Sequence, residues 1–187
     1  MDDIVFREVD CATWPDFAGL FESRGGPKSC WCMVWRATAA EAKRPGGATR
    51  RAAMKARVDA GVPIGILGYC RGAAMAWCSI APRPTYRPLG GLEVASAETV
   101  WSLACFFIKR EFRGRRLVDQ VLRAAVAHAA RHGATIVEAY PVDADSPSYR
   151  FMGFVDTFSK AGFQEVGRAG QRRHVMRLAV APAREQE

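Results

Sequence analysis

The sequence lacks any run of 18 apolar residues, so it contains no segment long enough to span a bilayer as a helix. It opens with Met1-Asp2-Asp3 and shows neither a basic segment nor an apolar stretch typical of a secretory signal, so we expect a cytoplasmic protein. Internal repeats and low-complexity blocks are also absent, which argues against solenoids and linkers. We expect one domain over residues 1–180, with a disordered tail over residues 181–187.

Lysine is scarce: the chain has 5 Lys against 22 Arg, and its net charge is +8. A basic excess is one mark of nucleic-acid binding. The arginines are dispersed along the chain and form no long run, which is more typical of a solvated surface or of a small polyanionic ligand. We therefore expect no nucleic-acid partner and no membrane partner.

None of the six cysteines belongs to a pair with the two-residue separation of a zinc knuckle. Cys30-Trp31-Cys32 is one residue too short, and no matching Cys/His pair follows it. Without a secretory signal the cysteines are expected to remain thiols, and most of them fall in apolar strand contexts. The three histidines lie on a predicted helix or in the last strand. The sequence therefore predicts no metal site.

The segment from Thr99 to Val142 is the most regular part of the chain. Apolar residues 100–108 predict a strand, residues 111–116 a basic turn, and residues 136–140 a second strand. The helix between them is predicted by an apolar stripe at three-and-four spacing, formed by Leu117, Val118, Val121, Leu122, Ala125, Val126 and Ala129. The N-terminus of such a helix, flanked by Arg113, Arg115 and Arg116, is a binding site for an anion such as a phosphate.

This strand, basic turn and helix resemble the acetyl-CoA-binding core of the GCN5-related N-acetyltransferases, in which a Q/R-x-x-G-x-G/A turn holds the CoA pyrophosphate. The segment 158–163, Phe-Ser-Lys-Ala-Gly-Phe, resembles the Tyr-x-x-x-Gly-Phe helix end of the same family. Together the two landmarks cover about half of the chain. A β-hairpin predicted over residues 64–80 lies where the family places one, just upstream of the acetyl-CoA strand.

The resemblance implies an α/β fold: a single domain with a mixed, mostly antiparallel, twisted sheet, flanked by helices and splayed where acetyl-CoA binds. It implies transfer of an acetyl group to a primary amine of a small molecule or peptide, with acetyl-CoA as donor and no metal. The predicted donor contacts are Phe106, Phe107 and Ile108 on the strand, then Arg113, Gly114, Arg115, Arg116, Leu117 and Val118 in the turn and helix. Apolar strands near the C-terminus leave a homodimer open.

Three positions depart from the family pattern. Arg116 stands where the pattern has its first glycine, and Val118 stands where it has Gly or Ala. Phe158 stands where many members place a tyrosine proposed to protonate the leaving thiolate, and a phenyl ring cannot donate a proton. These departures favour a second hypothesis, a CoA-binding protein of the same fold with little transferase activity.

The candidates for proton transfer are two carboxylates and a phenol. Glu138 lies within the strand 136–140, where a carboxylate could accept a proton directly or through water. Its alternative role is structural, as a strand glutamate that faces an arginine. Glu98, just before the acetyl-CoA strand, is the second candidate base, and Tyr140 could donate a proton or position the acceptor.

The segment 27–36 holds two tryptophans, two cysteines and a methionine within six residues. One interpretation is a buried plug that packs the N-terminal helices onto the sheet. The other is an acceptor pocket lined by Trp31 and Trp35, because large rigid rings suit an apolar or cationic ligand. The two interpretations are compatible. Downstream, Thr38 to Glu41 predicts a capping box and Thr49 a second helix cap.

Overall fold

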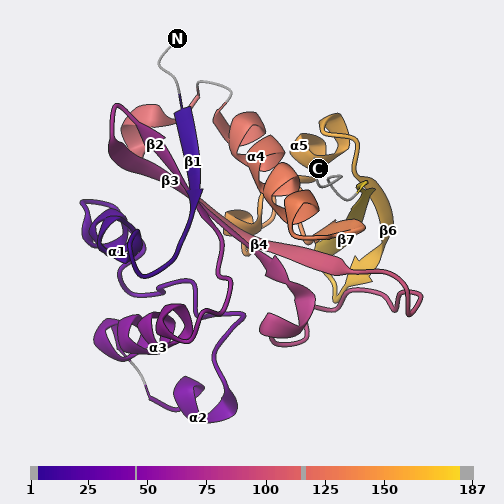
Figure 1. Ribbon diagram of the computed structural model, residues 1–187. Helices are drawn as coiled ribbons and strands as arrows, with labels where there is room; N and C mark the ends of the chain where they lie inside the picture. The colour runs from indigo at the N-terminus through magenta and orange to yellow at the C-terminus, as the bar shows by residue number, and fades with distance from the viewer. Residues whose placement is uncertain (1–3, 45, 115–116, 182–187) are drawn as a thin grey trace, which may run out of the picture.

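The computed structural model describes residues 4–44, 46–114 and 117–181. Its centre is a seven-stranded sheet in the order β1-β2-β3-β4-β5-β7-β6 (Figure 1). The strands are β1 (Ile4–Glu8), β2 (Ile66–Cys70), β3 (Ala73–Pro82), β4 (Val100–Ile108), β5 (Ile136–Ala139), β6 (Gln164–Ala169) and β7 (Arg173–Ala179). Only β4 and β5 pair in parallel; every other neighbouring pair in this sheet is antiparallel. The predicted mixed, mostly antiparallel α/β fold is confirmed.

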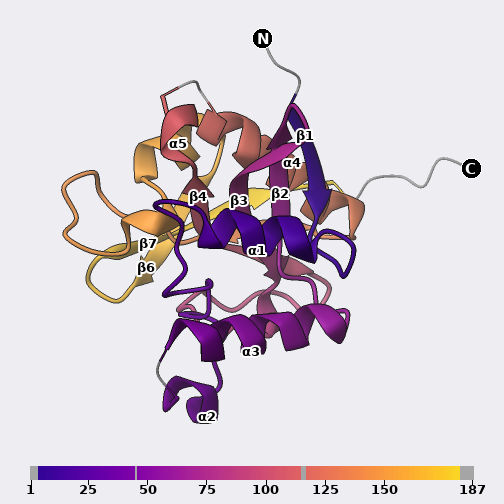
Figure 2. The same cartoon turned by 90° about the vertical axis from the view of Figure 1, so that its left-hand side faces the viewer.

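Helices cover both faces of the sheet (Figures 1 and 2). The helices are α1 (Trp14–Glu22), α2 (Ala39–Ala42), α3 (Gly47–Asp59), α4 (Leu117–Arg131) and α5 (Val155–Lys160), with 3-10 turns η1 (Arg83–Thr85), η2 (Arg110–Phe112) and η3 (Arg150–Met152). The apolar stripe of α4 packs with α5 on one face of the sheet. The buried faces of α1 and α3 pack on the opposite face. Within the described part of the chain, no helix is long and apolar enough to cross a membrane.

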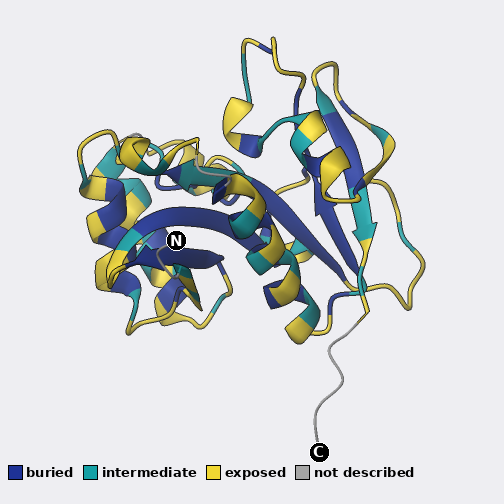
Figure 3. Ribbon diagram, turned by 90° about the horizontal axis from the view of Figure 1, so that it is seen from above, coloured by how far each residue is buried: buried dark blue, intermediate teal, exposed yellow. Residues whose placement is uncertain are grey.

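Burial is greatest in the central strands of the sheet, whereas the edge strands β1 and β6 are largely exposed or intermediate (Figure 3). All residues of β2 and β5 are buried, as expected for strands covered on both faces. Residues 86–92 form a loop that covers β5 and β6 on the face opposite α4, where Gly91 contacts Glu138 and Leu92 contacts Gly167. This loop is the element that encloses the polar cluster described below.

The N-terminal caps of α2 and α3 test two local predictions. The capping box is confirmed, because Thr38 Oγ1 accepts from Glu41 N and Glu41 Oε2 accepts from Thr38 N. The cap at Thr49 is wrong: the N-cap of α3 lies three residues earlier, at Gly46, with φ 117°. A glycine can take this positive φ without strain, so the helix starts at the Gly-Gly pair. The predicted disordered tail was 181–187; of these only Ala181 is described, and residues 182–187 lie outside the described residues.

Candidate active site

β4 and β5 separate halfway along β4. They pair from Val100 with Ile136 to Leu103 with Ala139, and β4 then continues to Ile108 beside β3 alone. The register between β3 and β4 shifts at the same level, where Ser79 pairs with Cys105 and Ile80 with Leu103. A β-bulge of this kind bends a strand and increases its twist. The β5-facing backbone edge of residues 104–108 is thereby released from the ladder to β5.

This splay is where the structure places the predicted donor strand. Phe106 and Phe107 are partly exposed and Ile108 is buried. Phe106 packs against Phe158, with ring centroids 6.0 Å apart, and Phe158 is fully buried. The position at which the family pattern has a tyrosine is therefore an apolar side chain inside the core, next to the donor strand.

The turn from β4 to α4 is tied to the end of the strand. Arg113 Nε donates to Ile108 O at 2.9 Å, and Gly114 follows with φ 84°, a conformation that favours glycine. Leu117 begins α4 with its side chain in the core, so it offers a ligand only its backbone, whereas Val118 is 38% exposed. Arg115 and Arg116, both predicted to bind pyrophosphate, lie outside the described residues.

A cavity of about 320 Å³ lies along the first two turns of α4 and is lined by residues of α4 and of the C-terminal end of α5. Its lining includes Arg123 and Lys160, together with Asp119 and Ala161. Two cations and one carboxylate leave it a net positive charge. The cavity lies one to two turns from the N-terminus of α4, so its cations add to the positive end of the helix dipole and suit a phosphorylated ligand.

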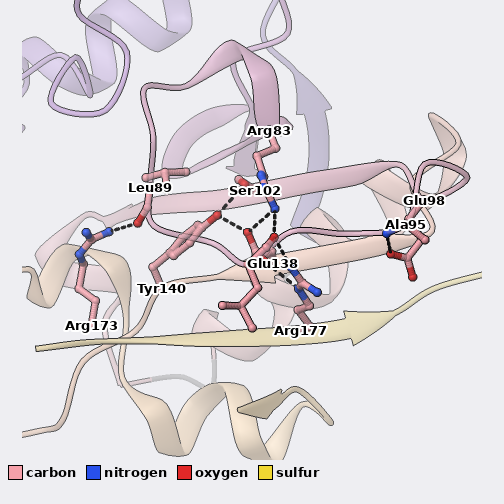
Figure 4. Close-up of polar contacts among 10 residues, drawn as sticks. Arg83, Leu89, Ala95, Glu98, Ser102, Glu138, Tyr140, Arg173 and Arg177 are labelled. Carbon is pink, nitrogen blue, oxygen red and sulfur yellow. Dashed lines mark hydrogen bonds and ion pairs between the residues drawn. The ribbon is translucent and has the colours of Figure 1, made fainter. Parts of the chain in front are cut away.

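Glu138 lies at the centre of a buried polar cluster on the opposite face of the sheet (Figure 4). Its carboxylate is fully buried; Oε2 lies 2.7 Å from Arg177 Nε and Oε1 lies 3.4 Å from Arg83 Nη1. Tyr140 donates its hydroxyl hydrogen to Oε1, and this hydroxyl also lies 3.1 Å from Ser102 Oγ. Two guanidinium groups and a phenol therefore enclose the Glu138 carboxylate.

Tyr140 is held in its protonated form by this arrangement. Burial, the charge of Glu138 and the hydrogen bond to Glu138 raise the pKa of Tyr140 well above its usual value near 10. The hydroxyl therefore retains its hydrogen across the neutral range and can donate it. Glu138 and Tyr140, both predicted as site residues, are brought together by the alternation of β5, which turns both side chains to one face.

Glu98 is not brought to this cluster. It is exposed in the loop before β4, where its Oε2 accepts a hydrogen bond from Ala95 N at 2.9 Å (Figure 4). The splay begins at residue 104, six residues along an extended strand, which corresponds to about 20 Å. Of the two predicted carboxylate bases, Glu138 is therefore much nearer to the point where β4 and β5 separate.

The two predicted acceptor residues have different environments. Trp31 is 2% exposed and stacks against Phe21 and Trp14 in the α1 core, as the plug interpretation expects. Trp35 is half-buried; the guanidinium of Arg173 lies 4.4 Å from its ring centroid, and Tyr149 lies close by. Trp35 Nε1 is buried and has no hydrogen-bond partner among the described residues. Trp35 is thus the more exposed of the two, and it has a buried ring nitrogen without a partner among the described residues.

Sequence reasoning missed Arg83, Arg177 and Gly91, which complete the Glu138 cluster. Arg177 is the register partner of Glu138 between β5 and β7, so Glu138 does face an arginine, as its structural alternative expects. Gly91 approaches so closely that a Cβ there would stand 1.9 Å from Glu138 Oε1. A lone arginine in a strand and a Gly-Gly pair in a loop are weak signals, because the sequence does not state which strands become neighbours.

An open mixed sheet whose central parallel pair splays at a bulge, followed by a basic turn into a helix, defines a class of acyl-CoA-dependent transferases. The sequence profile of the family described as the acetyltransferase (GNAT) family matches residues 29–154. The chain belongs to this family, as the resemblance indicated. A search of curated proteins finds no significant match to the sequence.

Solved structures share the fold at low identity. An N-acetyltransferase from Staphylococcus aureus Mu50 is 12% identical with a TM-score of 0.54, covering 95% of this chain and 98% of its own. yncA from Salmonella typhimurium, assigned to the acetyltransferases and solved with its cofactor acetyl-CoA, is 15% identical with a TM-score of 0.56, covering 97% and 98%. The Escherichia coli ribosomal-protein-S18-alanine N-acetyltransferase is 10% identical with a TM-score of 0.54, covering 99% of both chains.

Proposed function

We propose that this protein is an N-acetyltransferase that moves the acetyl group of acetyl-CoA directly to a primary amine of a small molecule or peptide, in a ternary complex. The observation that carries the proposal is the splay of β4 from β5, which runs straight into the Arg113–Gly114 turn and the start of α4. A likeness to yncA, which is solved with acetyl-CoA, and to two N-acetyltransferases supports the choice of donor and of acceptor class.

The donor fits the residues around the splay. The backbone of Phe106, Phe107 and Ile108 offers hydrogen bonds along the strand edge that β5 leaves, independent of side-chain identity. Arg113, Gly114 and the first turn of α4, with Leu117 and Val118, then provide amides and positive charge for the pyrophosphate. The basic cavity between α4 and α5 supplies Arg123 and Lys160 for a further phosphate of CoA.

Acetyl-CoA, when bound, supplies the thioester that the amine attacks. The chain contributes positioning, donors toward the developing oxyanion and a route for protons. We propose that the Tyr140 hydroxyl hydrogen-bonds to the acceptor or to the leaving sulfur, a role that Phe158 cannot fill, and that the thiolate takes its proton from water. Glu138 accepts the proton of the amine through Tyr140 or water, since its own carboxylate is fully enclosed. Trp35, with its unpaired Nε1, is proposed to contact the acceptor.

A CoA-binding protein with little transferase activity is the second candidate. Two observations favour it: Glu138 is engaged by two arginines in the manner of a structural ion pair, and Phe158 is apolar. Under this hypothesis acetyl-CoA binds as tightly as in an enzyme, and no amine accelerates thiol release. A sensor or regulator would have these properties.

The deciding experiment measures free-thiol release from acetyl-CoA with a panel of amines, polyamines, amino acids, aminoglycosides and short peptides, alongside calorimetric binding of acetyl-CoA. We expect turnover with one acceptor class, reduced at least a hundred-fold in kcat in Glu138→Gln with the Kd of acetyl-CoA unchanged. Glu98→Gln is the matched control and should retain activity. Binding without turnover across the panel would favour the second candidate, and absence of binding would overturn both.

A further inference from the structure

Two histidines and a glutamate converge at the end of α4 that is remote from the acyl site. His128 lies in the last turn of α4, His132 follows directly after the helix, and Glu8 is the last residue of β1. A spacing of four places both imidazoles on one face of the helix. One ligand atom from each of the three residues lies within 4.8 Å of the others. About 20 Å of helix separates this group from the start of α4, at 1.5 Å per residue.

The hydrogen bond made by the His132 ring leaves its other ring nitrogen free to bind a metal ion. Its Nδ1 lies 2.9 Å from the carbonyl oxygen of His128, and because a carbonyl only accepts, Nδ1 carries the hydrogen. Nε2 is then the nitrogen with a free lone pair, and it lies 3.6 Å from Glu8 Oε2. Two ligands bound tetrahedrally to Zn²⁺ at 2.0–2.1 Å stand about 3.4 Å apart. A backbone acceptor on the other ring nitrogen is the usual support of a ligating histidine.

His128 adds the second nitrogen. Its side chain is buried, and no hydrogen bond to either of its ring nitrogens is found within the described parts of the chain. Its ring lies 4.4 Å from that of His132, centroid to centroid, and Trp101 packs against both rings at 5.5 and 5.4 Å. The His128 ring lines a cavity, where its nitrogens can bind water or a cation.

The group opens into a cavity rather than into the core. A cavity of about 300 Å³ is lined by all three residues, by Asp10 and by the loop 61–65 before β2. Asp10 Oδ1 already accepts from Thr13 N and Thr13 Oγ1, so its carboxylate is committed to the start of α1. The fourth position of a tetrahedral ion therefore faces water in the cavity, where a small ligand could also enter.

We propose that Glu8, His128 and His132 form a binding site for a divalent transition-metal ion of the Zn²⁺ class, with two imidazole nitrogens, one carboxylate oxygen and a solvent molecule as ligands. Imidazole and carboxylate ligands suit Zn²⁺, Co²⁺, Ni²⁺ and Cu²⁺ more than Mg²⁺ or Ca²⁺. The ion would join the edge strand β1 to the end of α4. The site stands apart from the proposed acetyl transfer, and its test needs no acceptor.

The test uses the full chain without a histidine tag, freed of metal by chelation and kept reduced. Zn²⁺ affinity is measured by competition with a chromophoric chelator, and Co²⁺ is followed by its visible absorption. We expect one equivalent to bind, with at least ten-fold weaker binding in Glu8→Gln and in His132→Ala. Both side chains are exposed, so the variants should keep the fold, which circular dichroism checks.

Two control variants test whether the metal binds at these three residues or at the cysteine thiols. Glu22→Gln removes an exposed carboxylate on α1 and should leave the affinity unchanged; Cys30→Ser removes a thiol near Cys32 and should also leave it unchanged. A Co²⁺ complex without thiolate charge-transfer absorption would support nitrogen and oxygen ligation. Binding that survives His132→Ala and is lost in Cys30→Ser would overturn the proposal, as would failure of the wild-type chain to bind any of these ions more tightly than about 1 mM.

Discussion

Arg177 on β7 and Glu138 on β5 are register partners, and the guanidinium Nε of the first lies 2.7 Å from a carboxylate oxygen of the second. Glu138 is fully buried, whereas the Arg177 side chain is 16% exposed and that of Arg83 is 31% exposed. Losing an arginine should therefore destabilise the buried carboxylate more than losing Glu138 destabilises the arginines, because the arginines still reach water. This asymmetry decides what substitutions at the cluster should do.

Glu138→Gln should destabilise the fold by about 2–3 kcal/mol, near the lower end for breaking a buried pair, because the two arginines can regain water. Arg177→Met should cost about as much or more, since it leaves the buried carboxylate with the more distant Arg83 as its counter-charge. The double variant should be less destabilised than the sum of the two. Urea unfolding of the four proteins measures this cycle, and strict additivity would show that the pair contributes nothing of its own.

Tyr140→Phe should cost about 1 kcal/mol at neutral pH, because the Tyr140 hydroxyl donates to Glu138 and lies next to Ser102. The raised pKa of Tyr140 also predicts a pH effect. An unfolded tyrosine loses its proton above about pH 10 while the folded one keeps it, so stability is fully present below pH 10 and falls above it. In Tyr140→Phe the decline in stability should be smaller by up to about 1.4 kcal/mol per pH unit. Unfolding between pH 9.5 and about 11 tests it, and parallel curves would contradict the assignment.

Gly91→Ala and Gly19→Ala should have opposite effects. A Cβ at Gly91 would stand 1.9 Å from Glu138 Oε1, so the loop or the carboxylate must move, and we expect a loss of about 2 kcal/mol or more. Gly19 lies inside α1 with open space around its Cα, so alanine there should stabilise the protein by about 0.5–1 kcal/mol. Thermal unfolding of both variants is the measurement. A stabilised Gly91→Ala would show that the loop does not press on the carboxylate.

Glu41 joins α2 to α3 through Arg57, which donates to both carboxylate oxygens at 2.9 and 2.8 Å. The hydrogen bonds from Arg57 lower the pKa of Glu41 to about 2. An unfolded glutamate takes up a proton near pH 4.5, so the stabilisation is present above that pH and is lost as the pH falls toward about 2.

Glu41→Gln should therefore cost about 1–2 kcal/mol at pH 7, a value reduced for the partial exposure of the pair, and almost nothing at pH 2. Glu22→Gln is the control, because its partner Arg51 is 45% exposed and Glu22 is 52% exposed. That change should stay within about 0.5 kcal/mol. Equal pH profiles for Glu41→Gln and wild type would refute the assigned role of Arg57.

Arg113→Glu should weaken binding of acetyl-CoA by about 1–3 kcal/mol, or roughly ten- to a hundred-fold in Kd, if the turn holds the pyrophosphate. Arg44→Glu, on the loop between α2 and α3, makes the same charge change far along the chain and should leave the Kd unchanged. Titration calorimetry compares the two. Unchanged affinity in Arg113→Glu would remove the turn from the donor site.

Much of the part of the fold that forms the proposed acetyl-CoA site could be predicted from the sequence. The apolar run 100–108 became β4 with the predicted bounds, and the stripe from Leu117 became α4, because strand and helix periodicity are local properties. The hairpin of β2 and β3 follows from two apolar runs around Arg71-Gly72. The start of α3 was predicted three residues late, because the polar Thr49 and the glycine at position 46 are both acceptable N-cap residues.

The polar clusters could not be predicted from the sequence in this way. Glu138 and Arg177 stand 39 residues apart, and Glu8 and His132 more than a hundred, so no spacing rule relates them. Trp31 was a candidate for an acceptor pocket and is a core residue. Composition does not separate the two roles, because aromatic side chains are common both in ligand pockets and in cores. The sequence by itself determined the order of strands and helices, through the periodicity of apolar side chains. Only the tertiary structure decided which charges meet, because strand register and helix packing bring distant residues within hydrogen-bond range.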